Sequence, residues 1–159
     1  MESGRIVSIV YKPADAPEAA GGFTRVPPRE ARLLQGFGIE GDLKGGSHNR
    51  HLNIMSAETT ADLQEDGFKV APGELGEQIV VSGIDVDRLQ SGSRLRIGDA
   101  AEVEIVTART GCVTFESHQG KLRQEASGRL GMMANVVSSG IIRVGDPVSV
   151  PAGEPALAF

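Results

Sequence analysis

Glycines divide this chain into short apolar runs, and that spacing constrains the fold more than any other feature. The 159 residues contain 21 glycines and 8 prolines. Tryptophan is absent and tyrosine occurs once, so valine, isoleucine, leucine and alanine must build the core. Short aliphatic runs between turn residues are typical of strands. The sequence therefore predicts a mainly β protein, a barrel-like fold with a few short helices.

Two pairs of apolar runs are predicted as β-hairpins. The first joins 94–97 to 101–106, and the second joins 132–137 to 141–144 across a Ser-Ser-Gly turn. Residues 51–56 alternate between polar and apolar side chains, which predicts a strand with one buried face. Further strands are predicted at 5–11, 78–81 and 148–150, whereas 31–35 is compatible with a strand or a short helix.

One helix is predicted over 57–66, with Ser56 as its N-cap and Gly67 as its stop. A second helix is predicted over 113–126, although Gly120 weakens that pattern. Residues 85–90 are compatible with a single helical turn, and the glycine- and proline-rich stretches 12–28 and 37–46 are predicted as loops.

The length fits one domain, over 1–150, followed by a tail at 151–159 that we expect to be mobile. The formal charge of −5 comes from 16 basic and 21 acidic residues and does not favour a nucleic-acid-binding protein. No apolar run is long enough for a membrane span, and no signal peptide is evident at the start. We therefore expect a soluble, cytoplasmic protein.

Cys112 is the first candidate for chemistry. As the only cysteine, it excludes an internal disulfide and a cysteine-cluster zinc site. It follows Arg109 and precedes a predicted helix, a setting that lowers a thiol pKa. The alternative is a small buried core residue. His118 lies six positions further on and does not share a helix face with Cys112, which favours a solvated surface histidine.

The glycine-rich loop 38–46 is the second candidate. Its backbone N–H groups could face an anion, although a plain turn explains the glycines equally well. Arg50, just beyond it, could clamp a phosphate or simply be a surface arginine. His48 and His51 fall on opposite faces of a strand, so a metal held by protein ligands alone is not expected. The acids of 73–78 fit a solvated loop equally well.

Six segments in order together resemble the MOSC domain, named for the C-terminal domain of molybdenum cofactor sulfurase. They span 38 to 148, and the small stand-alone bacterial members are closest in size. The segments are Gly38-Ile39-Glu40-Gly41-Asp42, 52–58, 72–77, 92–98, Arg109-Thr110-Gly111-Cys112 and 140–148.

This resemblance implies a MOSC-type β-barrel that binds molybdenum cofactor (molybdopterin), handles sulfur destined for it, or does both. It makes Cys112 the candidate persulfide carrier. The residues that it implies would line the cofactor pocket or lie near it are Gly41, Asp42, Arg50, Glu77, Gln78 and Arg109.

The chain departs from the family pattern in three places. Leu43-Lys44 stand where the family has Arg-His, Gln78 where it has Asn, and Gly111 where it has Pro. No lysine has a recognisable setting for pyridoxal phosphate, so a partner such as a cysteine desulfurase would have to supply sulfur, and a molybdoenzyme would receive it. The alternatives are a non-catalytic module that delivers the cofactor and a molybdenum-dependent reductase of N-hydroxylated compounds.

Overall fold

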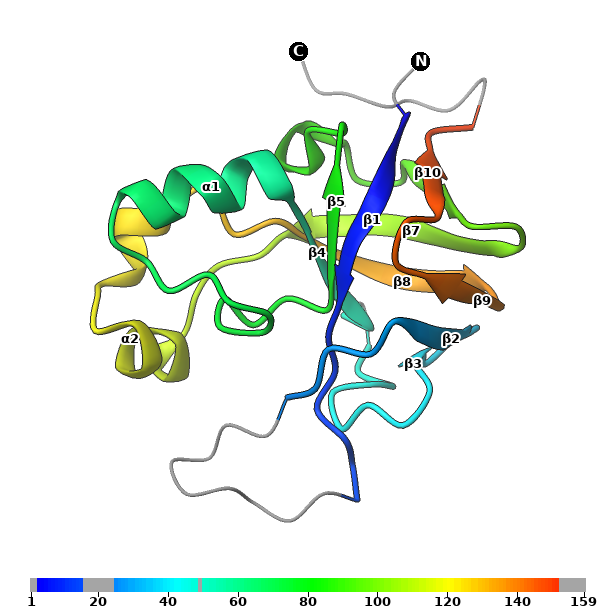
Figure 1. Cartoon of the computed structure of the whole chain (residues 1–159), viewed down its shortest axis with the longest axis horizontal. Helices are drawn as coiled ribbons and strands as arrows, with labels where there is room; N and C mark the ends of the chain where they lie inside the picture. The colour runs from blue at the N-terminus through cyan, green and yellow to red at the C-terminus, as the bar shows by residue number, and fades with distance from the viewer. Residues whose placement is uncertain (1–2, 16–24, 49, 152–159) are drawn as a thin grey trace.

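The structure is a computed structural model that describes residues 3–15, 25–48 and 50–151 (Figure 1). The middle of the predicted 12–28 loop and nearly all of the predicted mobile tail lie outside these residues. Within them, seven strands close into a barrel. In barrel order they are β1 (Ser3–Ile9), β10 (Pro147–Ser149), β6 (Arg94–Ile97), β7 (Ala101–Ala108), β8 (Met132–Ser138), β4 (Leu52–Ser56) and β5 (Ile79–Ser82).

The barrel encloses the aliphatic core that the composition required. Ile9, Ile54, Leu95 and Val103 are all fully buried in one cluster. Neighbouring strands pair antiparallel except β4 and β5, which run parallel with the helix α1 (Ala57–Glu65) between them in sequence. The predicted hairpin of β6 and β7 is confirmed. The mainly β fold with few short helices is therefore confirmed.

The second predicted hairpin is wrong. Residues 132–138 and 140–143 are both strands, but β8 pairs with β7 and β4, so both of its edges are occupied. The chain therefore leaves the barrel, and β9 (Gly140–Arg143) pairs instead with β2 (Glu30–Leu34). With β3 (Gly38–Ile39) these strands form a separate small sheet, which settles 31–35 as a strand and places two strand residues within the predicted loop 37–46.

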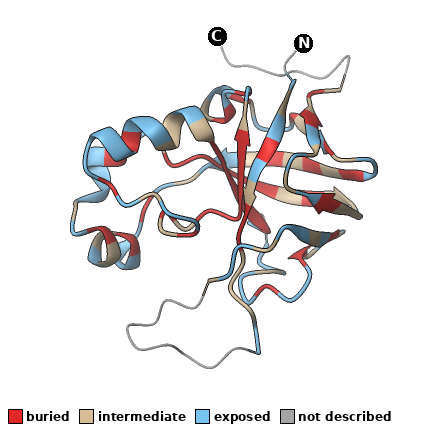
Figure 2. Ribbon diagram, viewed as in Figure 1, coloured by how far each residue is buried: buried red, intermediate tan, exposed pale blue. Residues whose placement is uncertain are grey.

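The expectation of one buried face on β4 is also wrong, because all five residues are buried (Figure 2). Leu52 and Ile54 belong to the barrel core. Met55 belongs to a second cluster outside the barrel, with Leu63 of α1 and Phe115. Polar residues at alternate positions of β4 therefore do not mark a solvent-facing side.

The helices differ from prediction in their details. Ser56 stands at the N-cap position of α1 but makes no capping hydrogen bond. The predicted helix 113–126 is broken into α2 (Val113–Gln119) and a 3-10 turn, η2 (Arg123–Ala126), because Gly120 adopts a left-handed φ of 68°. The predicted turn at 85–90 is the 3-10 turn η1 (Val86–Arg88). No helix in the described part of the chain is long and apolar enough to cross a membrane.

Candidate functional site

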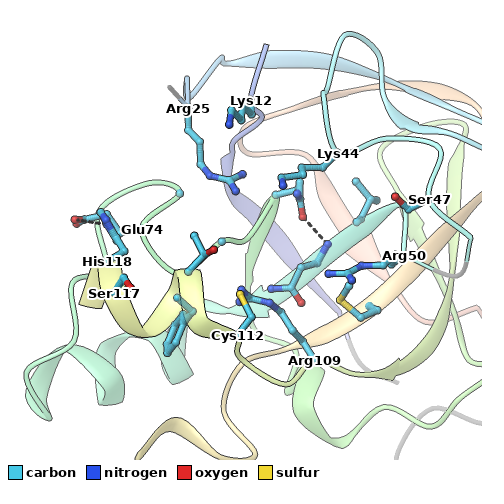
Figure 3. Close-up of a pocket in the computed structure, with 18 residues that line it drawn as sticks. Lys12, Arg25, Lys44, Ser47, Arg50, Glu74, Arg109, Cys112, Ser117 and His118 are labelled. Atoms are coloured by element: carbon cyan, nitrogen blue, oxygen red, sulfur yellow. Dashed lines mark hydrogen bonds and ion pairs between the residues drawn. The ribbon is translucent and has the colours of Figure 1, made fainter. Parts of the chain in front are cut away.

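A pocket of about 660 Å³ opens beside β4, between α2 and the segments around residues 44–50 and 73–78 (Figure 3). Its lining is strongly cationic, although the whole chain is acidic. Among the described residues, one acidic side chain lines it, Glu74. The cationic side chains in its wall are Lys12, Arg25, Lys44, Arg50 and Arg109.

Cys112 lines this pocket and is solvent-exposed, so the alternative of a buried core cysteine is wrong. Partial burial works against its ionisation. That effect is outweighed by hydrogen bonds from the backbone N–H groups of Phe115 and Thr114 and by the charge of Arg109, so the pKa of the thiol is lowered. The predicted setting for a nucleophilic thiolate is therefore present in the pocket wall.

Arg109 is the cation that acts on this thiol. Its Nη1 donates to the carbonyl of Leu75, and its guanidinium lies 5.7 Å from the centre of the Phe115 ring. Gly76 leaves room for it, since a Cβ there would lie 2.6 Å from Nη2. Burial lowers the pKa of Arg109, and the nearby charges of Cys112 and Glu77 oppose that shift.

Glu77 does not line the pocket itself but is buried between the lining residues Gly76 and Gln78 in the sequence. It is 3% exposed, and its Oε2 accepts a hydrogen bond of 2.9 Å from the N–H of Gly73. Burial raises the pKa of its carboxyl, against the opposing effects of backbone hydrogen bonds and the Arg25 charge. Gly73 makes room for Arg25 as Gly76 does for Arg109, because a Cβ on Gly73 would lie 2.7 Å from Arg25 Cδ.

Gln78 lines the pocket next to Asn53 of β4. Its side-chain Oε1 accepts a 2.6 Å hydrogen bond from the Asn53 N–H, and its own N–H donates to the Asn53 carbonyl over 2.9 Å. These bonds extend the pairing of β4 with β5 by one step. They fix the start of β5, and so the end of the segment that carries Glu77.

Gly41 and Asp42 are not among the residues that line the pocket. Asp42 is 2% exposed, and its Oδ1 accepts hydrogen bonds from the N–H groups of Lys12 (3.2 Å) and Lys44 (3.1 Å). It therefore holds together the two backbones that carry these lysines to the pocket. Arg50 does line the pocket, as predicted for a ligand clamp.

The histidines are placed differently from one another. His51 is buried, and its Nδ1 accepts a 3.0 Å hydrogen bond from the Val136 N–H, while burial and then His48 lower its pKa. His118 is partly exposed, as a surface histidine would be, but it also lines the pocket and its Nε2 lies 3.3 Å from Glu74 Oε2. No cluster of metal-ligating side chains occurs among residues 3–15, 25–48 and 50–151.

Sequence reasoning missed Lys12 and Arg25 as wall residues, and it interpreted His118 and the acids of 73–78, which include Glu74, as solvated. Lys12 lies shortly after the first strand, and that position could have identified it as a candidate pocket residue. Arg25 carries no local signal, because it reaches the site only through tertiary packing against Gly73. Figure 3 shows Lys12, Arg25 and Lys44 on one side of the pocket and Cys112 with the remaining arginines on the other.

This arrangement suits a ligand with several negative charges that also reacts at sulfur. Five cations around one cavity attract anions through their summed field. An arginine beside the thiol favours the nucleophilic thiolate over the neutral thiol.

Comparison with known proteins supports a common origin and a common fold. The family model described as MOSC domain matches residues 41–149. No functionally curated protein matches the sequence.

Among solved structures, the chain is similar to the YuaD protein of Bacillus subtilis, with a TM-score of 0.75, 21% identity, and coverage of 92% of this chain and 94% of that one. It is also similar to YiiM of Geobacillus stearothermophilus (TM-score 0.72, 18% identity, 96% and 79% coverage). YiiM of Escherichia coli gives a TM-score of 0.67 at 21% identity, covering 93% and 70%. At these identities the likeness concerns the fold.

Proposed function

The chain belongs to the MOSC domain family, which is associated with molybdenum cofactor binding, and from this premise we propose that its cationic pocket binds that cofactor while Cys112 carries sulfur for it as a persulfide. The observation that carries the proposal is the position of an exposed thiol with a lowered pKa inside a pocket lined by five cations.

The residues present fit such a ligand. The pterin phosphate and the oxo groups on molybdenum are anionic and match the excess of cations over the single carboxylate in the wall. Arg25 Nη1 is buried and has no hydrogen-bond partner in the described part of the chain, so the pocket offers a cationic donor that the described residues leave unsatisfied. When bound, the cofactor supplies a redox-active metal, and the chain's own residues bind and orient it.

Cys112 would accept sulfur in one displacement step. Its thiolate attacks the terminal sulfur of a persulfide on a partner protein of the cysteine desulfurase class. A new S–S bond forms on Cys112 as the donor's S–S bond breaks, and the donor cysteine leaves as a thiolate. Because the chain has no second cysteine, an intramolecular disulfide does not discharge the persulfide.

The carrier role is tested by incubating the protein with a cysteine desulfurase and cysteine that contains radioactive sulfur. We expect label that is released by reductant on the wild type and none on Cys112→Ser. Arg96→Gln, which removes an exposed cation outside the pocket, should be labelled like the wild type. Equal labelling of wild type and Cys112→Ser would refute the carrier role.

Cofactor binding is tested separately by titration with molybdopterin. Arg50→Gln should weaken binding several-fold because it removes a cation from the wall, whereas Arg96→Gln should not. If both variants bind equally well, the pocket is not the binding site. If Cys112→Ser binds and delivers the cofactor normally, the result favours the alternative function, a module that delivers the cofactor without a covalent step.

A further inference from the structure

Glu77 is a buried carboxylate next to the pocket, in the segment against which Arg25 and Arg109 pack. It is 3% exposed, and its second oxygen, Oε1, is buried with no hydrogen-bond partner among the residues that the structure describes. A buried carboxylate is costly unless cations or hydrogen bonds offset the lost hydration. Arg25 packs against Gly73, whose N–H binds the Glu77 carboxylate, and Arg109 packs against Gly76, the residue before Glu77. Both positive charges act on Glu77.

The groups that face Glu77 come from three parts of the chain. From its own loop, the N–H groups of Gly73 and Leu75 act on the carboxylate. From the segment before β2 comes Arg25, and from the end of β7 comes Arg109, which is itself influenced by Arg50 and Cys112. The carboxylate therefore shares its two arginines with whatever anion enters the pocket.

We propose that Glu77 takes up a proton from solvent when an anion binds in the pocket, so that ligand binding and protonation are coupled. The inference rests on the proposed function only for the assignment of an anionic ligand. An added negative charge beside Arg25 and Arg109 competes with the Glu77 carboxylate for the same positive field. Protonation of the carboxylate to the neutral acid removes that competition, and the proton comes from water or buffer.

The direction of the pH dependence follows. Burial already raises the pKa of Glu77 from its ordinary value of 4.5, and a bound anion raises it further. The complex then holds more protons than the free protein. The affinity for an anion therefore increases as the pH falls through the range in which the free protein and the complex differ in the protonation of Glu77. At the limit the affinity changes about tenfold per pH unit, corresponding to one proton for each anion bound.

Sulfate is a suitable probe because it does not titrate in this range. Its binding is measured by calorimetry at several pH values between about 5 and 7, each in two buffers with different ionisation enthalpies, which gives the protons taken up. We expect net proton uptake on sulfate binding in the wild type and its loss in Glu77→Gln. Glu58→Gln, which alters a carboxylate outside the pocket wall, should match the wild type.

Proton uptake that persists in Glu77→Gln, or no sulfate binding by the wild type, would overturn the inference. If Glu77→Gln fails to fold, infrared difference spectra of the wild type decide the matter: a protonated carboxyl band should appear with sulfate, and its absence refutes the idea. The outcome is separate from the proposed function, since proton-coupled sulfate binding without molybdopterin binding would remove only the latter.

Discussion

At the scale of single residues, the site depends on how its charges are spaced. Arg109 acts on two neighbours, the Cys112 thiol at the pocket surface and the Glu77 carboxylate behind it. The guanidinium is held by the Leu75 carbonyl and the Phe115 ring, so its position does not depend on either charged partner. A fixed cation can stabilise a thiolate without being neutralised by it.

Replacement of Arg109 by Gln should make Cys112 less reactive at neutral pH. The variant loses the positive charge that favours the thiolate, so the pKa of the thiol should rise and its alkylation by iodoacetamide at neutral pH should slow several-fold. The full pH profile of the rate measures this effect. An unchanged profile in Arg109→Gln would show that the backbone N–H groups of Thr114 and Phe115 alone control the thiol, and Arg96→Gln serves as the matched charge control.

At the scale of elements, a side chain at a helix end can serve a neighbouring element. Ser56 Oγ donates to the Ile84 carbonyl over 2.5 Å and accepts from the Val86 N–H over 2.8 Å. Ser56 thereby links the junction of β4 and α1 to η1. Since Ser56 is 2% exposed, the Ile84 carbonyl and the Val86 N–H depend on its hydroxyl as their hydrogen-bond partner.

The two interpretations of Ser56, as an N-cap and as a bridge between backbone groups, predict different stabilities for its variants. As an N-cap, Ser56→Asp would be tolerated. As the observed bridge, Ser56→Asp and Ser56→Ala should both destabilise the protein, the latter by about 1–3 kcal/mol, because buried backbone groups lose their partner. Urea unfolding measures the difference, with the exposed Ser127→Ala as control. Wild-type stability in Ser56→Asp would restore the capping interpretation.

At the scale of the whole molecule, Gly131 joins the pocket to the barrel. Its carbonyl accepts from the Arg109 N–H over 3.0 Å, and its N–H donates to Asp87 Oδ1 over 3.0 Å. A Cβ at this position would lie 2.2 Å from the Ile54 carbonyl oxygen, which belongs to the backbone of the barrel strand β4. The position of Gly131, and of the Arg109 backbone bonded to it, relative to the barrel therefore depends on this close approach.

Gly131 and Gly128 form a matched pair, because both have a φ near 80° but only Gly131 lacks space for a side chain. Gly128→Ala should cost about 1–2 kcal/mol of stability from backbone strain alone. Gly131→Ala should cost about 1–3 kcal/mol more, since the chain must move away from β4. Thermal or urea unfolding compares them, and equal losses would contradict the close packing of β4 against Gly131.

The amino-acid sequence by itself determined the class of fold, most strand positions and the β6–β7 hairpin, and it marked Cys112 as a candidate. These follow from local rules: aliphatic runs between glycines favour strands, and a lone cysteine after Arg109 is conspicuous. Tertiary structure alone decided that β9 pairs with β2, that β4 is buried on both faces, and that Lys12, Arg25 and His118 reach the pocket. The physical reason is that strand partners and pocket walls are made by residues far apart in the chain, whose contacts depend on which edges and faces the rest of the fold leaves open.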